Sequence, residues 1–169
     1  DGTIVFQPNG GTGGNLMRVS SAGGTPAPLL TLAEGEATQR WPQVLPGGQA
    51  VLFTSHTVIG NYEEASIVVQ ALPNGPRTVL QRGGYYGRYL PSGHVVYLHE
   101  GTLFAVPFDL DRLAVAGPPV PVLDGVTTGA GTAGAQFAVS GTGTLVYLPG
   151  LSISTDVPIA WLDRTGQTT

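Results

Sequence analysis

The chain has 169 residues and a net charge of −4, with 41% hydrophobic and only 11% charged residues. This length allows one domain or part of a larger one. All seven basic residues are arginines scattered along the sequence, which argues against a nucleic-acid-binding surface. The absence of cysteine excludes disulfides and thiolate sites, and no apolar stretch approaches the roughly 20 residues of a membrane span.

The first part of the chain predicts three strands joined by glycine-rich connections. Thr3–Gln7 is a run rich in β-branched and aromatic residues, and a glycine-rich loop follows it. Leu16–Ser20 is the second predicted strand. A turn with two glycines then leads into the third, Ala27–Leu32.

The next segment predicts four strands in a row. A Pro-Gly-Gly turn separates the first two strands and a Pro-Asn-Gly turn separates the last two. The longer loop His56–Glu64 joins the middle pair. The four predicted strands are Trp41–Leu45, Ala50–Ser55, Ser66–Leu72 and Arg77–Gln81.

The remaining residues repeat this order. The third set of predicted strands is Arg88–Leu90, His94–Leu98, Thr102–Phe108 and Val120–Leu123. Between its last two strands, Asp109 and Asp111 are expected to form a hairpin corner, where aspartate bonds to its own backbone. The fourth set of predicted strands is Ala135–Ser140, Thr144–Leu148 and Ile159–Asp163.

One short pattern, a turn glycine and an apolar strand that ends in an aromatic residue, occurs four times. The closing aromatics Phe6, Phe53, Tyr97 and Tyr147 are 47, 44 and 50 residues apart, a spacing typical of four-stranded propeller blades. A β-sandwich would not repeat the order of turn types, a parallel β-helix has shorter repeats, and no segment has helical periodicity. We therefore predict an all-β fold, a partial β-propeller with about 3.5 four-stranded blades. As one domain spanning residues 1–169, it has blades at 1–32, 40–81, 86–123 and 135–169.

The turns of this pattern resemble a known repeat. Arg40–Phe53 and Tyr89–Tyr97 resemble the WD40-like repeat of TolB-type β-propellers, which carries an aromatic residue, Ser-Pro-Asp-Gly and an apolar strand. Gly101–Arg112 is similar to repeats of large bacterial proteins that join a kinase to such a propeller. The family's turn aspartate is replaced by Gly47, Ser92 and Thr142, and the family's usual propeller has more blades than this chain supplies. The resemblance implies a bacterial binding module in the periplasm or outside the cell.

The best candidates for binding lie on the longer loops, which emerge at one end of a propeller. Tyrosines on such loops give contact area at little entropic cost, although some of them also serve to cover blade edges. The predicted rim consists of His56, Tyr62, Glu63, Glu64, Tyr85 and Tyr86.

Other patterns do not point to catalysis or to a cofactor. His56 and His99 lie at matching strand ends of neighbouring units, where they either bind a metal ion or simply add polarity to loops. No Gly-x-Ser-x-Gly motif is present, and the glycine-rich tracts at 9–14 and 129–134 lack the Gly-Lys-Ser/Thr ending of a phosphate-binding loop. We predict no catalytic residue, no metal site and no cofactor.

These observations favour a non-enzymatic scaffold that recognises a protein or peptide through loops at one end of the ring. The alternative is the propeller domain of a hydrolase, such as a prolyl-oligopeptidase-type peptidase. The incomplete blades would expose unpaired strand edges, which recruit other strands. We therefore expect either a homodimer or the remainder of a larger propeller to complete the ring, and neither a nucleic-acid partner nor a membrane span.

Overall fold

The computed structural model describes residues 2–8, 13–129 and 131–150, and these residues form an all-β fold. Every regular element among them is a strand, apart from one turn of 3-10 helix, η1 (Tyr62–Glu64). The predicted all-β class is therefore confirmed. Within the described ranges no helix is long and apolar enough to cross a membrane.

The first two sheets are antiparallel, and each is built from strands that follow one another in the sequence. Sheet 1 has the order β1-β2-β3 and sheet 2 the order β4-β5-β6-β7. The strands of sheet 1 are β1 (Thr3–Phe6), β2 (Met17–Ser20) and β3 (Ala27–Pro28). The strands of sheet 2 are β4 (Thr38–Val44), β5 (Ala50–His56), β6 (Ser66–Ala71) and β7 (Arg77–Arg82).

Sheet 3 repeats this arrangement, and two short hairpins follow it. Its strands run in the order β8-β9-β10, and β10 then pairs with both β11 and β12. The strands of sheet 3 are β8 (Tyr85–Leu90), β9 (His94–His99), β10 (Thr102–Asp109), β11 (Ala114–Val115) and β12 (Val120–Leu123). The hairpins pair β13 (Thr128–Gly129) with β14 (Gly134–Ala135), and β15 (Phe137–Val139) with β16 (Leu145–Tyr147).

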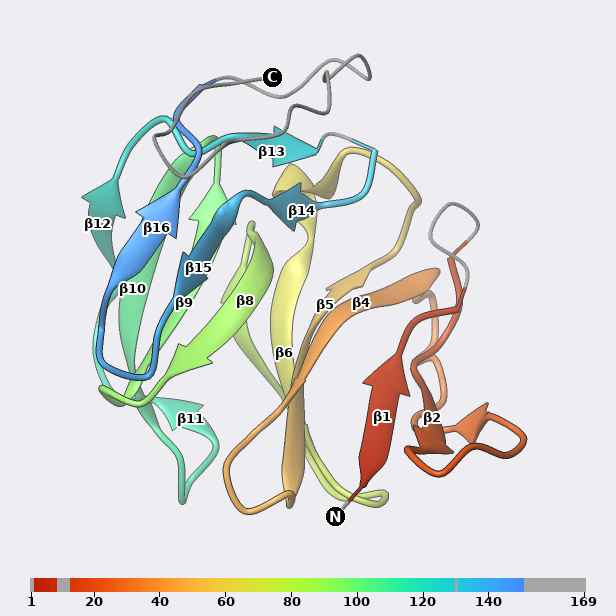
Figure 1. Ribbon diagram of the computed structural model, residues 1–169. Coiled ribbons are helices and arrows are strands. Elements are labelled where there is room, and N and C mark those ends of the chain that lie inside the picture. The colour runs from red at the N-terminus through yellow and green to blue at the C-terminus, as the bar shows by residue number, and fades with distance from the viewer. Residues whose placement is uncertain (1, 9–12, 130, 151–169) are drawn as a thin grey trace, which may run out of the picture.

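The sheets follow one another in space in chain order (Figure 1). Three clusters of apolar side chains form the core. Val51, Phe53 and Val68 of sheet 2 pack with Leu16 and Leu30, which lie next to β2 and β3 of sheet 1. The opposite face of sheet 2, which includes Leu52 and Val69, packs on sheet 3. This use of both faces explains why β5 reads as a continuous apolar run, since its residues 50–54 are all buried.

The predicted strand Ala27–Leu32 is too long, since β3 ends at Pro28, and the predicted strand Ala135–Ser140 is divided between β14 and β15. The short strands β11 and β13 were not predicted. The other predicted strands among the described residues agree with the observed ones to within about one residue, except at the starts of β4 and β8. Both strands begin earlier than expected and contain an irregularity in register, between Arg40 and Gln43 in β4 and between Tyr85 and Arg88 in β8. Trp41 and Tyr86 sit in these irregularities with φ of 54° and 56°. A bulge interrupts the alternation of side chains, so the sequence pattern shows only the part of each strand beyond it. The predicted strand Ile159–Asp163 lies outside the described residues.

The loop between sheets 1 and 2 is fixed by the carboxylate of Glu36, whose side chain is only 3% exposed. Arg77 donates to both carboxylate oxygens at 2.5 and 2.9 Å, and Ser55 and the backbone N–H of Ala33 donate as well. Burial alone would raise the pKa of Glu36. The hydrogen bonds, that from Arg77 first, outweigh this effect and lower the pKa.

Candidate functional site

The candidate site is the end of sheets 2 and 3 where η1 lies, here called the η1 face. η1 follows the β5 loop after Gly60 and Asn61, which both have positive φ, and it turns Tyr62 inward. The backbone N–H groups of Gly83 and Gly84 both donate to the carbonyl of Ala65, at 2.9 and 3.1 Å. These bonds attach η1 to the connection between β7 and β8.

The carboxylate of Glu63 links three separate segments of the chain at this face. It accepts hydrogen bonds from the hydroxyl of Tyr85 at 3.1 Å and from the backbone N–H of Glu100 at 2.7 Å. Its Oε2 also lies 3.5 Å from Nδ1 of His99. η1, the start of β8 and the turn between β9 and β10 are thereby held in one arrangement.

Tyr85 remains a hydrogen-bond donor to Glu63 over the whole ordinary pH range. Burial raises the pKa of Tyr85 to about 12, and the neighbouring Glu63 carboxylate adds to this rise. The phenolate would lie in an apolar environment next to a carboxylate, so the neutral hydroxyl is favoured. The Tyr85 hydroxyl therefore keeps the proton that it donates to Glu63.

A second group of predicted residues lies beneath this surface. The rings of His56 and Tyr62 are 5.6 Å apart, and the guanidinium of Arg40 lies 5.1 Å from the Tyr62 ring centre. His56 and Tyr62 are both buried. Nε2 of His56 and the hydroxyl of Tyr62 have no hydrogen-bond partner among the described residues. These side chains support the η1 face from below.

The structure therefore divides the six residues of the predicted rim. His56, Tyr62 and Tyr85 are buried, Glu63 and Tyr86 are half-buried, and Glu64 is exposed. The expected loop position of Tyr85 and Tyr86 is wrong, because both belong to β8, which starts before its bulge. The part of all six residues in binding stays a prediction.

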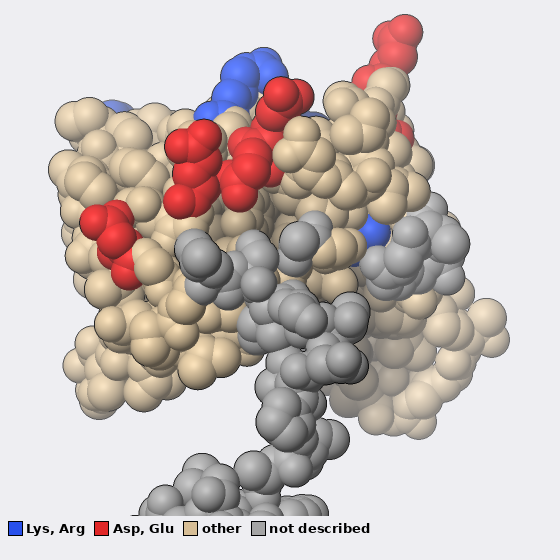
Figure 2. All heavy atoms as spheres, turned by 90° about the horizontal axis from the view of Figure 1, so that it is seen from above, with Lys and Arg blue, Asp and Glu red and all other residues tan. Residues whose placement is uncertain are grey.

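Two acidic residues that the sequence pattern did not single out also belong to this face. Glu100 and Asp124 are exposed, and Asp124 accepts a hydrogen bond from the hydroxyl of Thr102 at 2.8 Å. Figure 2 shows acidic side chains gathered on this side of the molecule, with a basic side chain beside them. The position of Glu100 in the tight turn before Gly101 was a usable signal, since that turn leaves its sheet at the same end as the β5 loop.

Tyr86 points away from the η1 face and takes part in an aromatic row inside the molecule. Its ring makes edge-on contacts with Trp41 at 5.0 Å and with Phe137 at 5.4 Å between ring centres. The guanidinium of Arg88 lies 4.1 Å from the centre of the Tyr86 ring. Tyr86 thus joins β4, β8 and β15, and it is placed to act in packing between sheets.

The remaining titratable residues singled out in the sequence have local roles. The backbone N–H groups of Asp111 and Arg112 donate to Oδ1 of Asp109 at 3.0 and 2.9 Å, which confirms the predicted aspartate corner. His94 is bonded within its own turn, to Ser92. Among the described residues, no group of three or more His, Asp or Glu side chains is arranged to hold a metal ion.

No protein-family model matches the chain, and no curated protein or solved structure matches it. The site is thus defined by its own chemistry: a fixed acidic surface supported by buried aromatic side chains.

Proposed function

We propose that this chain is a TolB-like β-propeller module in which each sheet is one blade. The repeated turn supports this proposal. The N–H groups of Gly48, Gly93 and Gly143 each donate to the carbonyl three residues earlier, at 3.0 Å. All three glycines have positive φ, of 72°, 77° and 89°. Identical turns between the first two strands of successive sheets are expected of a blade repeat.

The function we propose is non-enzymatic recognition of a protein or peptide at the η1 face. The observation that carries this proposal is the set of contacts made by the Glu63 carboxylate, which holds η1, the start of β8 and the turn between β9 and β10 in one surface. The exposed side chains of Glu64 and Glu100 carry negative charge at that surface. A pre-arranged acidic surface favours basic partners, because binding then requires little ordering of the receptor. A position in the periplasm or outside the cell remains part of this proposal.

Selection of a random peptide library against the chain tests this function. We expect enriched peptides rich in Lys and Arg, with affinity that falls as salt rises. Glu64→Gln and Glu100→Gln should each weaken binding by about two- to fivefold, as expected for an exposed ion pair. Asp111→Asn removes the same charge from an exposed turn and serves as the matched control. Enriched peptides that bind equally well to all three variants would contradict the proposal.

We also propose that a second copy, or further blades of a larger ring, covers the open faces of the outer sheets. Val146, Tyr147 and Leu148, at β16, are 60%, 42% and 49% exposed, and Ile4 of β1 is 51% exposed. Exposed apolar residues on successive positions of a strand are typical of an interface. Light scattering over a range of concentrations separates the two cases, since only self-association gives twice the chain mass.

A further inference from the structure

A second candidate binding site lies away from the η1 face, in a cavity of about 370 Å³ between sheet 1 and the first strands of sheets 2 and 3. Its walls come from β1, from β4, from β8 and from the turn between β13 and β14. The lining residues are Val5, Phe6, Gln7, Arg40, Trp41, Pro42, Arg88 and Thr132. The lining contains two arginines and no carboxylate.

One wall of this cavity is an open strand edge. Among the described residues β1 pairs only with β2. Ser21 donates its N–H to the carbonyl of Gly2, so these two residues form a hydrogen-bonded pair. Because bonded and non-bonded pairs alternate along an antiparallel ladder, the backbone groups of Ile4 and Phe6 also point toward β2. The N–H of Leu29, which donates to the carbonyl of Leu16, confirms this alternation from the other side of β2. The backbone N–H and carbonyl of Val5 therefore point away from β2, at the edge that lines the cavity.

The opposite wall carries a positive charge that is held by neutral groups. Nη1 of Arg88 donates to the carbonyls of Trp41 and Gly87 at 2.8 and 2.9 Å, and its guanidinium stacks on Tyr86. No carboxylate of a described residue forms an ion pair with Arg88. These contacts fix the planar fork of N–H groups, and such a fork matches the two oxygens of a carboxylate.

The indole of Trp41 gives the cavity a rigid apolar surface. Its Nε1 donates to the carbonyl of Thr132 at 2.8 Å, and its ring contacts Tyr86 edge-on. Trp41 is therefore held by hydrogen bonding as well as by packing. Pro42 and Phe6 extend the apolar lining. The outward-facing backbone groups of Val5, a fixed positive charge and an apolar wall together suit an extended peptide with acidic side chains.

We propose that this cavity binds an extended acidic peptide segment, which pairs with β1 through Val5 and places one carboxylate on Arg88. Charge complementarity selects the acidic occupant, because the only charged side chains in the lining are those of Arg40 and Arg88. This site shares Arg40 with the side chains beneath the η1 face, but it includes none of the acidic residues of that face, where the proposed partner has the opposite charge.

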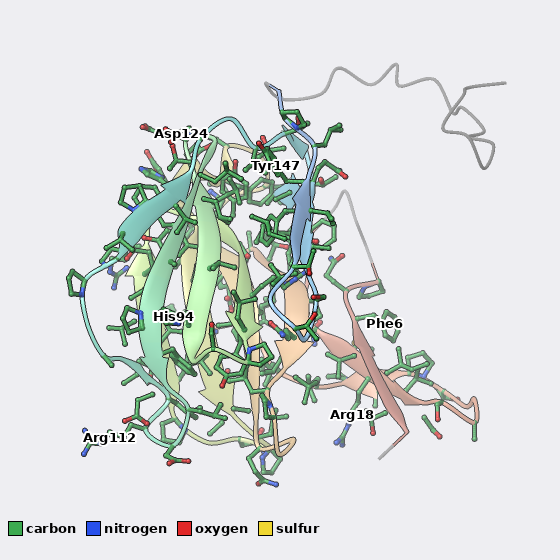
Figure 3. All side chains as sticks on the ribbon, turned by 60° about the vertical axis from the view of Figure 1, so that its left-hand side comes forward. Phe6, Arg18, His94, Arg112, Asp124 and Tyr147 are labelled. Atoms are coloured by element: carbon green, nitrogen blue, oxygen red, sulfur yellow. The ribbon has the colours of Figure 1, made fainter. Side chains whose placement is uncertain are left out.

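Fluorescence polarisation with two labelled peptides tests the proposal, one alternating Glu and Val and the other Lys and Val. The Glu peptide should bind the wild-type chain, and Arg88→Gln should weaken binding by about 10- to 100-fold, the loss expected for a charged hydrogen-bond partner. Arg88→Lys keeps the positive charge but lacks the planar fork of N–H groups, so its affinity for the Glu peptide should lie between those of the wild type and Arg88→Gln. The matched control is Arg112→Gln, since the Arg112 side chain is 84% exposed and lies in a turn of sheet 3 (Figure 3). Equal binding of the Glu peptide to the wild type and Arg88→Gln would overturn the proposal.

Backbone pairing is tested on the peptide, so that the protein fold is unchanged. Methylating alternate backbone nitrogens blocks one edge of the peptide, and two such patterns cover its two edges. We expect one pattern to abolish binding and the other to preserve it, because only one edge can pair with β1. Equal effects of the two patterns would exclude strand pairing even if Arg88→Gln does not fold.

Two further outcomes distinguish an acidic peptide at β1 from a second copy of the chain and from the basic partner of the η1 face. If wild-type chains form a dimer that Val5→Pro dissociates, the edge of β1 binds a second copy, and the acidic-peptide proposal is wrong. Binding of basic peptides to the η1 face should be unchanged in Arg88→Gln. The proposal for the η1 face and the one for the cavity therefore succeed or fail independently.

Discussion

The substitution Glu36→Gln is expected to destabilise the fold by about 3 kcal/mol, because it leaves the Arg77 guanidinium without its anionic partner. The Glu36 side chain is 3% exposed, whereas that of Arg77 is 23% exposed, so water compensates only part of this loss. Glutamine preserves the size of the side chain, which restricts the effect to charge and hydrogen bonding. Arg112→Gln removes an exposed ion pair and should cost only about 0.5 kcal/mol.

Urea unfolding measures this difference directly. With a slope of about 2 kcal/mol per molar urea, a loss of 3 kcal/mol lowers the midpoint by roughly 1.5 M. The pH dependence adds a second criterion. The folded pKa of Glu36 is lowered, so its stabilisation is present above the unfolded value of 4.5 and is lost as pH falls through the folded pKa. A midpoint shift as small as that of Arg112→Gln, or the same acid sensitivity in Glu36→Gln as in the wild type, would refute this reasoning.

Two further predictions concern the contact between sheets 2 and 3. Tyr85→Phe should cost about 1 kcal/mol through loss of the bond to Glu63, and it should remove the tyrosine that ionises near pH 12 in an absorbance titration. Because the folded pKa of Tyr85 is raised, its stabilisation is complete below pH 10.0 and is lost as pH rises toward about 12, a loss that Tyr85→Phe should lack. Gly87→Ala would place a methyl group 2.8 Å from Cγ2 of Ile67, so we expect it to lower the melting temperature, at a cost of about 1–3 kcal/mol. Gly141→Ala, where no atom lies within 4 Å, should be neutral or stabilising, and an equal effect of the two alanines would contradict the predicted clash.

The parts of the fold that could be predicted are those encoded by neighbouring residues. The turn glycines at 48, 93 and 143 have positive φ, and the apolar runs after the first two form the buried strands β5 and β9. The run after Gly143 forms β16 as predicted, although this strand is largely exposed. The bulges at Trp41 and Tyr86 could not be predicted because nothing local marks them: each depends on packing against the next sheet. The loss of alternation at Tyr86 also explains why Tyr85 was predicted in a loop, although it lies in the buried start of β8.

The candidate site was predicted in part, for a similar reason. The sequence places Tyr62, Glu63 and Tyr85 near one end of two sheets, and the structure joins Glu63 to Tyr85. The sequence does not reveal which of these side chains face inward, because a single turn of 3-10 helix has no periodicity to interpret. The cavity at Arg88 depends on the approach of β1, β4 and β8, which lie far apart in the sequence.

The consecutive order of strands within each sheet has a consequence for how the molecule opens. Strand neighbours in sheets 1, 2 and 3 lie close together in the sequence, so each sheet can lose its hydrogen bonds without unthreading another. Amide hydrogen exchange should then divide into cooperative groups that coincide with whole sheets. Sheet 2, which is covered on both faces, should exchange last, and the small sheet formed by β1, β2 and β3 should exchange first.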